Sequence, residues 1–373
     1  MEDVAKAGPR GDGRRHVLAL DGGGVRGIVT LRMLETFEER FGVAAGDFFD
    51  FFAGTSTGAI IAALLAFRDN SARQILDLYR DLVGRVFQWS LSSSRIGRLF
   101  SRVMYSREFA EGKLAELFGE IRLGELAPGP RGPRGILLTT HDLVRNEELF
   151  LSNFPLKGER TNFGPTWKVR DAVAASALSA PWYFGPWEGR FTDGGLTVFN
   201  TPARQAAIEA LDYCASPACR AGGIVVWSFG SGAFETVFRR GDAGGWYPWS
   251  WAARLFRDIQ SDAEADQVFG AARMARQGEI EFRRYQVTLG ESTLIDLGYR
   301  GKVPDLPIEL DRADARDFLD EAGRLFAARI DWSDPAGFRL SAPSSDPLED
   351  PQLWRSGEPP PHSRPPGRSA RLA

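Results

Sequence analysis

The stretch Val17-Leu18-Ala19-Leu20-Asp21-Gly22-Gly23-Gly24-Val25-Arg26-Gly27 predicts a buried strand, a tight turn and a helix in direct succession. Four consecutive apolar residues are typical of a short buried strand, and the apolar spacing from Val25 to about Phe41 is that of an amphipathic helix. The turn between them consists of glycines, so its backbone N–H groups can come close to an anion at the N-terminus of the helix. An anion site at this turn is therefore expected.

The stretch Gly54-Thr55-Ser56-Thr57-Gly58 repeats this arrangement with a serine at its centre. It follows the apolar run Phe48–Phe52, predicted as a strand, and precedes Thr57–Phe67, whose alanines and isoleucines suit a tightly packed helix. Gly-x-Ser-x-Gly between a strand and a helix is the nucleophile-elbow pattern, in which the two glycines let both elements approach closely around the serine. In a chain with 41 glycines such a pattern also arises by chance. A nucleophilic Ser56 is therefore a hypothesis at this point.

Strand-like and helix-like segments alternate along the rest of the chain. Helices are predicted at Ala72–Val83 and at Ser106–Phe118, the second with Ser106 as its N-cap. Strands are predicted at Gly135–Thr140, Glu148–Ser152, Gly223–Ser228 and Tyr285–Leu289. This order predicts an α/β fold, a three-layer α/β/α domain with a mainly parallel central sheet. In such a sheet ligands bind at the carboxyl ends of the strands, where both glycine turns are expected.

The composition limits the class of protein. At 373 residues, 43% of them hydrophobic, the chain is long enough for one large domain or two smaller ones. A formal net charge of -3 argues against a mainly nucleic-acid-binding protein. The two cysteines, Cys214 and Cys219, predict neither a disulfide framework nor a cysteine-rich zinc site, and no metal or cofactor is expected.

The two ends of the chain differ from its middle. Residues 1–15 are polar and charged, without the apolar segment of a signal peptide, and are predicted to be flexible. Residues 16–342 form the predicted domain, and residues 343–373, rich in proline, serine and arginine, are predicted to be disordered. No apolar run reaches the ~18–20 residues of a spanning helix, so we expect a cytoplasmic protein for which contact with a membrane surface stays open.

The first glycine turn also fits a different function. Gly22-x-Gly24-x-x-Gly27, after a strand and at the start of a helix, satisfies the dinucleotide-binding fingerprint. That fingerprint goes with an acidic residue at the end of the next strand, about 20 residues further on. Here the next strand ends in Ala53-Gly54-Thr55-Ser56, and Asp21 would bring a negative charge close to a bound pyrophosphate. Dinucleotide binding is therefore the less favoured interpretation.

A third glycine pair, in Thr192-Asp193-Gly194-Gly195, can hold a carboxylate close to another part of the backbone, although Asp-Gly is equally a common turn. A Ser-His-Asp triad would need an imidazole near the serine. His362 lies in the predicted tail, and His16 precedes the first strand on the side away from the site. His141 ends a predicted strand and stays a candidate, but no third group is placed to orient it. Direct assistance of Ser56 by a carboxylate is the more economical mechanism.

Taken in order, three blocks of this sequence resemble the patatin-like phospholipases: Asp21–Gly27, Gly54–Gly58 and Asp193–Gly195. Supporting similarity lies at Ala175-Ser176-Ala177, Ala180-Pro181, Ser228–Gly232 and Thr139-Thr140-His141-Asp142. The resemblance covers roughly Val17 to Ile295. One departure is Asn200-Thr201-Pro202, since the family commonly has Asn-Pro after its Asp-Gly-Gly block.

The resemblance implies a patatin-type three-layer fold and a catalytic dyad, carried here by Ser56 and Asp193. It also implies oxyanion-hole glycines, an arginine that supports the loop or holds a substrate phosphate, and elbow glycines, which are here Gly22, Gly23, Gly24, Arg26, Gly54 and Gly58. The implied activity is that of a lipid acyl hydrolase of the phospholipase A type acting on membrane glycerolipids. A non-catalytic lipid-binding or interaction protein with the same fold is the alternative.

Three segments combine aromatic, aliphatic and arginine residues and are candidates for contact with a bilayer: Phe87-Gln88-Trp89-Ser90-Leu91, Arg95–Met104, and Trp246–Trp251 leading into Ala253–Ile259. Trp and Tyr beside Arg suit a membrane interface or a lid over an acyl channel. Ordinary packing is the alternative, because a chain with 26 phenylalanines must bury many aromatic side chains.

Overall fold

The computed structural model describes residues 13–87, 103–154, 164–181, 183–213, 223–234, 247–306 and 308–333, except for the side chains of 248–250 and 252–257. Residues 1–12 and the predicted tail 343–373 lie outside the described residues. The same holds for most of the aromatic segments 87–91 and 95–104 and for the side chain of Trp249. The described residues all belong to one folding unit, Met1–Phe338.

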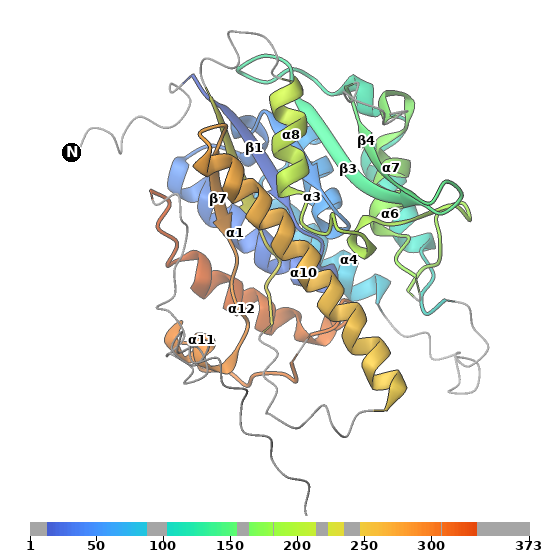
Figure 1. Ribbon diagram of the computed structural model, residues 1–373, viewed down its shortest axis with the longest axis vertical. Coiled ribbons are helices and arrows are strands. Elements are labelled where there is room, and N and C mark those ends of the chain that lie inside the picture. Colours follow the sequence, from blue (N-terminus) through green and yellow to red (C-terminus); the bar gives the residue numbers. More distant parts are fainter. Residues whose placement is uncertain are drawn as a thin grey trace, which may run out of the picture. The chain divides into compact units, whose positions relative to one another are not determined.

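A seven-stranded sheet forms the centre of the described part of the chain (Figure 1). Its main path has the order β4-β3-β2-β1-β6-β7, and β5 pairs with β3 beside this path. The strands are β1 (Arg15–Leu20), β2 (Phe51–Gly54), β3 (Gly135–Asp142), β4 (Glu147–Ser152), β5 (Phe191–Asp193), β6 (Ile224–Phe229) and β7 (Glu281–Tyr285). Neighbours among β1, β2, β3, β6 and β7 run parallel, while β4 and β5 are antiparallel to β3.

Helices cover both faces of the sheet. In β1, Leu18 and Leu20 belong to one hydrophobic core and Val17 and Ala19 to the other, as the alternation of side chains along a strand requires. The first core also contains residues of α1 (Gly27–Phe41), α2 (Ala45–Phe48), α3 (Thr57–Phe67), α4 (Ala72–Val86), α6 (Glu108–Phe118), α7 (Val169–Ala177), α11 (Glu291–Asp296) and α12 (Arg316–Ala327). On the second face lie α8 (Ala203–Tyr213) and α10 (Pro248–Arg276), which Figure 1 shows in front of the sheet. The predicted three-layer α/β fold with a mainly parallel sheet is confirmed.

Helix α3 occupies the centre of the first face. It is apolar on all sides, and every residue from Thr57 to Ala66 is buried, as expected of a helix enclosed by other elements. It contacts β1, β2 and β3 as well as α4 and α7. This packing fixes the first turn of α3 and, with it, the backbone of Ser56 just before the helix.

Strand β1 is the point at which the strand order changes direction, because β2 lies on one side of it and β6 on the other. The carboxyl ends of these three parallel strands border one crevice, which is the usual place of a ligand site in an open α/β sheet. The segments that follow them contain Gly22–Gly24, Ser56 and Gly230–Gly232. Both glycine turns therefore lie at the sheet edge where the sequence predicts them.

The predicted strand Phe48–Phe52 is wrong in its boundaries. Residues Ala45–Phe48 form helix α2, whose aromatic side chain packs into the first core, and the strand covers Phe51–Gly54. Its position is set by the pairing with β1, in which Leu20 lies opposite Gly54. An apolar run does not mark where a strand begins, since buried helix and buried strand residues are both apolar.

The predicted strand Tyr285–Leu289 is also displaced, because β7 covers Glu281–Tyr285. The charged residues of β7 have tertiary partners that no local pattern reveals. The guanidinium of Arg283, for example, lies 4.3 Å from the centre of the Trp227 ring. The apolar side chains that suggested a strand after Tyr285 are buried in the segment that follows β7.

The remaining predicted elements are confirmed with small shifts at their ends. The first helix starts at Gly27 after a 3-10 turn at Gly24–Arg26, and the helix that begins at Ala72 continues to Val86. Helix α6 begins at Glu108 with Arg107 as its N-cap. The predicted N-cap, Ser106, accepts a hydrogen bond from the N–H of Glu108 at 3.3 Å. Within the described ranges, no helix has the length and apolar character needed to cross a bilayer.

Candidate active site

Ser56 lies on a strained turn between β2 and α3. Its φ of 53° and ψ of -121° place a non-glycine residue in a conformation that side chains rarely adopt. Close packing requires the two glycines beside it. A Cβ on Gly54 would lie 2.3 Å from the carbonyl oxygen of Gly58, and a Cβ on Gly58 would lie 2.3 Å from that of Leu20. The turn has the geometry of a nucleophile elbow.

The backbone of Ser56 is held from helix α7. Its N–H donates a hydrogen bond to Oγ of Ser176 at 3.1 Å, and Ser176 is fully buried. The hydroxyl of Thr57 donates to the carbonyl of Gly24 at 3.0 Å, so the strained turn is fixed on both sides. Sequence similarity singles out Ala175-Ser176-Ala177, but no local signal connects it with a residue 120 positions earlier.

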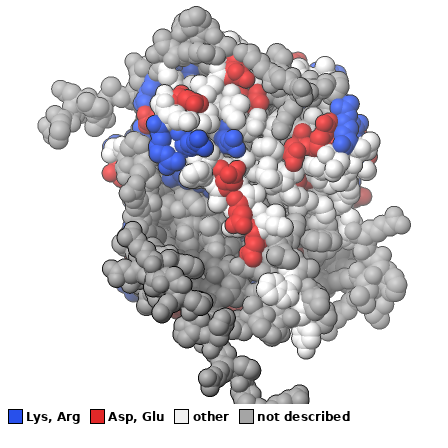
Figure 2. Space-filling view, in the orientation of Figure 1, with Lys and Arg blue, Asp and Glu red and all other residues white. Residues whose placement is uncertain are grey.

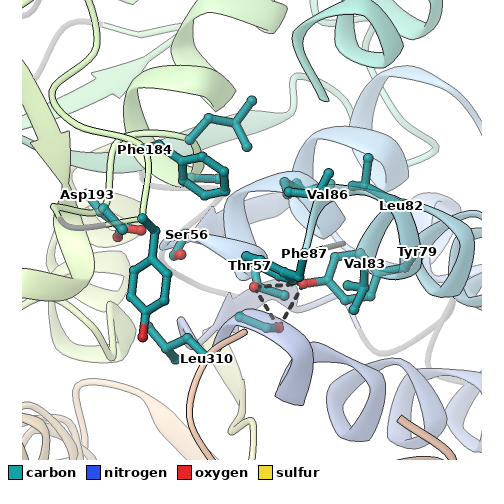
Figure 3. Close-up of a pocket in the computed structure, with 16 residues that line it drawn as sticks. Ser56, Thr57, Tyr79, Leu82, Val83, Val86, Phe87, Phe184, Asp193 and Leu310 are labelled. Atoms are coloured by element: carbon teal, nitrogen blue, oxygen red, sulfur yellow. Dashed lines mark hydrogen bonds between the residues drawn. The ribbon is translucent and has the colours of Figure 1, made fainter. Parts of the chain in front are cut away.

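Asp193 lies at the end of β5, opposite Thr140 of β3. It is 4% exposed, and its carboxylate accepts a hydrogen bond from the N–H of Gly195 at 2.7 Å. Burial raises the pKa of Asp193 to about 6, while its interactions with the Ser56 side chain and with the N–H of Gly195 act in the opposite direction. Figure 3 shows the Ser56 and Asp193 side chains next to each other at one end of a pocket. The structure thus brings the predicted serine and carboxylate together.

The two histidines within the described residues are placed differently. His141 lies opposite Thr192 in the ladder between β3 and β5, one position along from the pair formed by Thr140 and Asp193. Because successive side chains of a strand point to opposite faces, His141 and Asp193 lie on opposite faces of the sheet. His16 is buried in β1, and its Nδ1 accepts a hydrogen bond from Nε1 of Trp227 at 3.2 Å. This geometry disfavours a triad.

The N–H groups of the first glycine turn have different partners. The N–H of Gly22 donates to the carbonyl of Asn200 at 3.0 Å, and that of Val25 donates to the carbonyl of Leu310 at 2.8 Å. The part of the chain that the structure describes offers no hydrogen-bond acceptor to the N–H groups of Gly23 and Gly24. Two of the three predicted donors are therefore available next to the N-terminus of α1.

The loop after β6 holds this turn in place. Oγ of Ser231 donates to the carbonyl of Gly22 at 2.8 Å. The guanidinium of Arg26 donates to the carbonyls of Gly23 and Gly232 at 3.3 and 2.9 Å. Of the two roles that the sequence predicts for Arg26, these contacts are those of a residue that supports the loop.

Asp21, the first residue of the turn, belongs to a buried ion pair. Its carboxylate accepts hydrogen bonds from Arg284 at 2.9 and 2.6 Å and from the hydroxyl of Thr201 at 2.9 Å. The amide of Asn200 donates to the carboxylate of Glu264 on α10. The segment that departs from the family pattern is therefore fixed both to the end of β1 and to α10.

Ser56 and Asp193 line an apolar pocket with about 520 Å³ of empty space, open solvent at its mouth included. Its walls come from α3, α4, the segment after α7 and a segment near the C-terminal end of the described residues, and they include Ile60, Leu82, Val86, Phe184 and Leu310 (Figure 3). No pattern in the sequence around Leu310 predicts that it lines the pocket.

Polar groups of the pocket wall mostly support the glycine turn. The hydroxyls of Thr57 and Tyr79 donate to the carbonyl of Gly24 at 3.0 and 2.7 Å, as the dashed lines in Figure 3 show. Ser56 and Asp193 bring to this wall a hydroxyl and a carboxyl group, the pair of groups that a serine nucleophile and its base would require. Among the residues with described positions, no group of three or more His, Cys, Asp or Glu side chains could hold a metal ion.

A three-layer α/β domain with a serine elbow at the carboxyl edge of its sheet defines a class of α/β proteins that includes many hydrolases. The sequence model of the patatin-like phospholipase family matches residues 18–207, which is just over half of the chain. The chain therefore belongs to the patatin-like phospholipase family, as its ordered sequence blocks predict. This assignment replaces the dinucleotide-binding interpretation of the first glycine turn.

Several relatives carry phospholipase names. The chain is 32% identical over 216 residues to the 85/88 kDa calcium-independent phospholipase A2 of Mus musculus. This match covers 53% of this chain and 24% of that protein. It is 29% identical over 232 residues to the calcium-independent phospholipase A2-gamma of Homo sapiens, and the match covers 60% of this chain and 29% of that protein. It is 29% identical over 209 residues to the cGAMP-activated phospholipase of Escherichia coli (strain TW11681), and the match covers 52% of this chain and 56% of that protein. The chain thus spans about a quarter of the length of the mouse relative.

A comparison with solved structures finds a more distant likeness. The match with the crystal structure of the type III effector protein ExoU covers 84% of this chain and 52% of the ExoU chain, with a TM-score of 0.34 and 15% sequence identity. A likeness at this level carries no argument about the site.

Proposed function

We propose that the chain is a lipid acyl hydrolase of the phospholipase A type, which cleaves fatty acyl esters of membrane glycerolipids through Ser56 and Asp193. The observation that carries this proposal is the position of the Ser56 hydroxyl next to the buried Asp193 carboxylate, in the wall of an apolar pocket (Figure 3). A serine nucleophile needs an adjacent base, and an apolar pocket suits a hydrocarbon chain. The phospholipase names of the relatives favour the same substrate class.

In the first step, Asp193 accepts the Ser56 proton while Oγ attacks the carbonyl carbon of the ester. An ordinary aspartate is a weak base, but the raised pKa of Asp193, about 6, is closer to the pH at which a general base works best. The N–H of Gly195 keeps the carboxylate oriented. The lipid alcohol then leaves with the proton, and the fatty acyl group stays on Oγ of Ser56.

The negative charge on the attacked carbonyl oxygen requires hydrogen-bond donors, and we assign this role to the N–H groups of Gly23 and Gly24. The N-terminus of α1 adds positive potential at the same place. The N–H of Gly22 is bonded to Asn200, so Gly22 contributes by close approach, since a Cβ there would lie 3.3 Å from Cβ of Ser56. In the second step Asp193 takes a proton from the water molecule that attacks the acyl-serine; this proton then passes to Oγ of Ser56 as its bond to the acyl group breaks, and the fatty acid is released.

Hydrolysis of an uncharged short-chain ester is expected to depend on pH through Asp193. The base acts when it is ionised, so kcat/KM should rise as the pH increases through about 6 and level off above about 7. At a pH of about 5 roughly one tenth of the carboxyl is ionised, and kcat/KM should be about tenfold below its maximum. A midpoint near ~3.9, the ordinary aspartate value, would contradict the buried base. Tryptophan fluorescence over the same range controls for unfolding.

Exposed apolar side chains lie on α10, close to the turn that follows Asp193. Trp251 and Ile259 are 41% and 66% exposed, and residues eight positions apart share a helix face. The amide of Gln260 donates to the carbonyl of Gly195 at 2.7 Å, which places this part of α10 beside the site. We infer that α10 contacts the lipid surface from which the substrate is taken.

The charge of α10 indicates which lipid surface fits. Asp258, Asp262 and Asp266 recur at every fourth position and so share a face of the helix. Figure 2 shows acidic side chains in a line on this side of the molecule. The arginines Arg254, Arg257, Arg273 and Arg276 balance the acidic residues of the same helix, so α10 has no net positive charge to favour an anionic surface, and neutral phosphatidylcholine is the surface used for the test.

Replacing Trp251 and Ile259 together by Ala is expected to weaken binding to phosphatidylcholine vesicles at least about tenfold, because full burial of one such side chain is worth roughly 1.5–3 kcal/mol. Hydrolysis of a soluble short-chain ester should fall much less, since neither residue lines the pocket. Vesicle co-sedimentation and initial rates measure the two effects. Equal losses in both assays would point to a folding role and would count against the membrane contact.

The alternative function, lipid binding without turnover, is separated from hydrolysis by one comparison. Wild type and Ser56→Ala are incubated with mixed phospholipid vesicles, and free fatty acid is measured. Release by the wild type and not by the variant supports the proposed function. Equal release by both proteins contradicts the role of Ser56, and vesicle binding without release by either favours the binding protein.

A further inference from the structure

Next to the pocket that contains Ser56 lies a second chamber, enclosed mainly by α3, α4 and α6. It has about 390 Å³ of empty space, counted with any solvent at its opening. The two cavities share the wall residues Ile60, Tyr79, Leu82 and Leu178. A single layer of side chains therefore lies between them.

The second chamber is more apolar than the first. Beyond the shared wall it is lined by Leu64, Leu78, Ala110, Lys113, Leu114 and Leu117. The ammonium group of Lys113 bonds to Glu116 at 2.7 Å, so it is the aliphatic stem of Lys113 that faces the chamber. An unpaired polar ligand would lose its hydrogen bonds to water in such a chamber, whereas a hydrocarbon would not. The chemistry of the walls therefore selects an aliphatic chain.

We propose that this chamber receives the methyl end of a long fatty acyl chain whose ester group is at Ser56, and that Ile60, Leu82 and Leu178 form the gate between the two cavities. The proposal rests on the proposed function. A short acyl group fits within the first pocket, while a longer one must return to solvent or pass the gate. Each methylene moved out of water is worth about fourfold in affinity. The protein is thus expected to prefer long acyl esters.

The test fills the chamber in the full-length chain. Ala110→Leu adds three carbon atoms to a position that is 1% exposed and lines the chamber. Ala115→Leu is the matched control on the same helix, at a half-buried position outside both linings. The ratio of kcat/KM for the p-nitrophenyl ester of palmitate to that of butyrate is expected to fall at least about tenfold in Ala110→Leu, which corresponds to about two methylenes. In Ala115→Leu the ratio should not change.

Binding of free fatty acids separates this inference from the hydrolysis itself. In the Ser56→Ala background, calorimetry should show palmitate binding more tightly than octanoate, and Ala110→Leu should remove that difference. This result supports the chamber even if the wild type hydrolyses no ester, an outcome that contradicts the proposed function alone. Ester hydrolysis that depends on Ser56, with a ratio that Ala110→Leu leaves unchanged, overturns the chamber and keeps the function.

A second variant guards against failure of Ala110→Leu to fold. Leu114→Ala enlarges the same chamber and should raise the kcat/KM ratio of stearate to palmitate esters. A ratio equal to that of the wild type in a folded Leu114→Ala protein overturns the proposal.

Discussion

The Ser56→Ala protein is expected to release fatty acid at least ~10⁴-fold more slowly than the wild type, the scale seen when a catalytic serine is removed. The neighbouring hydroxyls cannot take over, because each is committed to a backbone carbonyl. The hydroxyl of Thr55 donates to the carbonyl of Phe199 at 2.6 Å, and that of Thr57 donates to the carbonyl of Gly24 at 3.0 Å. The remaining rate would come from oxyanion stabilisation and substrate binding alone.

A second substitution at the same position separates chemistry from stability. Glycine tolerates the φ of 53° that strains Ser56, so Ser56→Gly should melt at a temperature no lower than Ser56→Ala. Both variants should be equally inactive toward phosphatidylcholine and toward a soluble ester. Activity of either folded variant within about tenfold of the wild type would contradict the assignment of Ser56 as nucleophile.

Asp193→Asn is expected to lower kcat about 10⁴-fold and, at the same time, to stabilise the protein near neutral pH. An amide cannot accept the Ser56 proton, so the nucleophile loses its base. The N–H of Gly195 can still donate to the amide oxygen, which preserves the local loop. Loss of activity together with a gain in stability distinguishes a catalytic carboxylate from a structural one.

The gain in stability follows from the pKa of Asp193. A carboxyl whose pKa is raised from 3.8 in the unfolded chain to about 6 in the folded protein opposes folding in its ionised form. This penalty is absent below a pH of about 4, grows as the pH rises to about 6 and is constant above that, with a size of at most about 3 kcal/mol. Urea titrations should therefore show a larger gain for Asp193→Asn at a pH of about 7.5 than at about 4.5. A less stable variant at the higher pH would mean that the carboxylate is held there for structure.

His141→Ala is the control for the dyad, because its imidazole lies on the face of the sheet opposite Asp193. This variant should keep most of the wild-type activity. If His141→Ala were inactive and Asp193→Asn active, the base would be the histidine and the assignment would be reversed.

The elbow can be predicted from the sequence because its geometry depends on residues a few positions apart. Gly54 and Gly58 allow a backbone approach that any Cβ would block, and the apolar run after Ser56 predicts the buried helix α3. The boundaries of β2 are predicted less well. Its register depends on β1, a partner that local apolarity does not identify.

The base for Ser56 is an intermediate case. The block Asp193-Gly194-Gly195 is visible in the sequence, but by itself it fits a common turn equally well. The pairing of β5 with β3 places the carboxylate next to Ser56, and burial raises its pKa. The scarcity of histidines favours this base before the structure does, while the placement of His141 on the other face is a matter of strand register.

By itself, the sequence determines the family, the layered α/β fold, the serine turn and the glycine turn, because spacing and composition report local backbone geometry and burial. The tertiary structure alone decides which glycine N–H groups are available, since Asn200 and Leu310 reach the turn from distant parts of the chain. It also decides the support of Ser56 by Ser176 and the two adjoining apolar cavities. Hydrogen-bond partners and cavity walls are formed by residues that come together only when the chain is packed, and no local pattern encodes them.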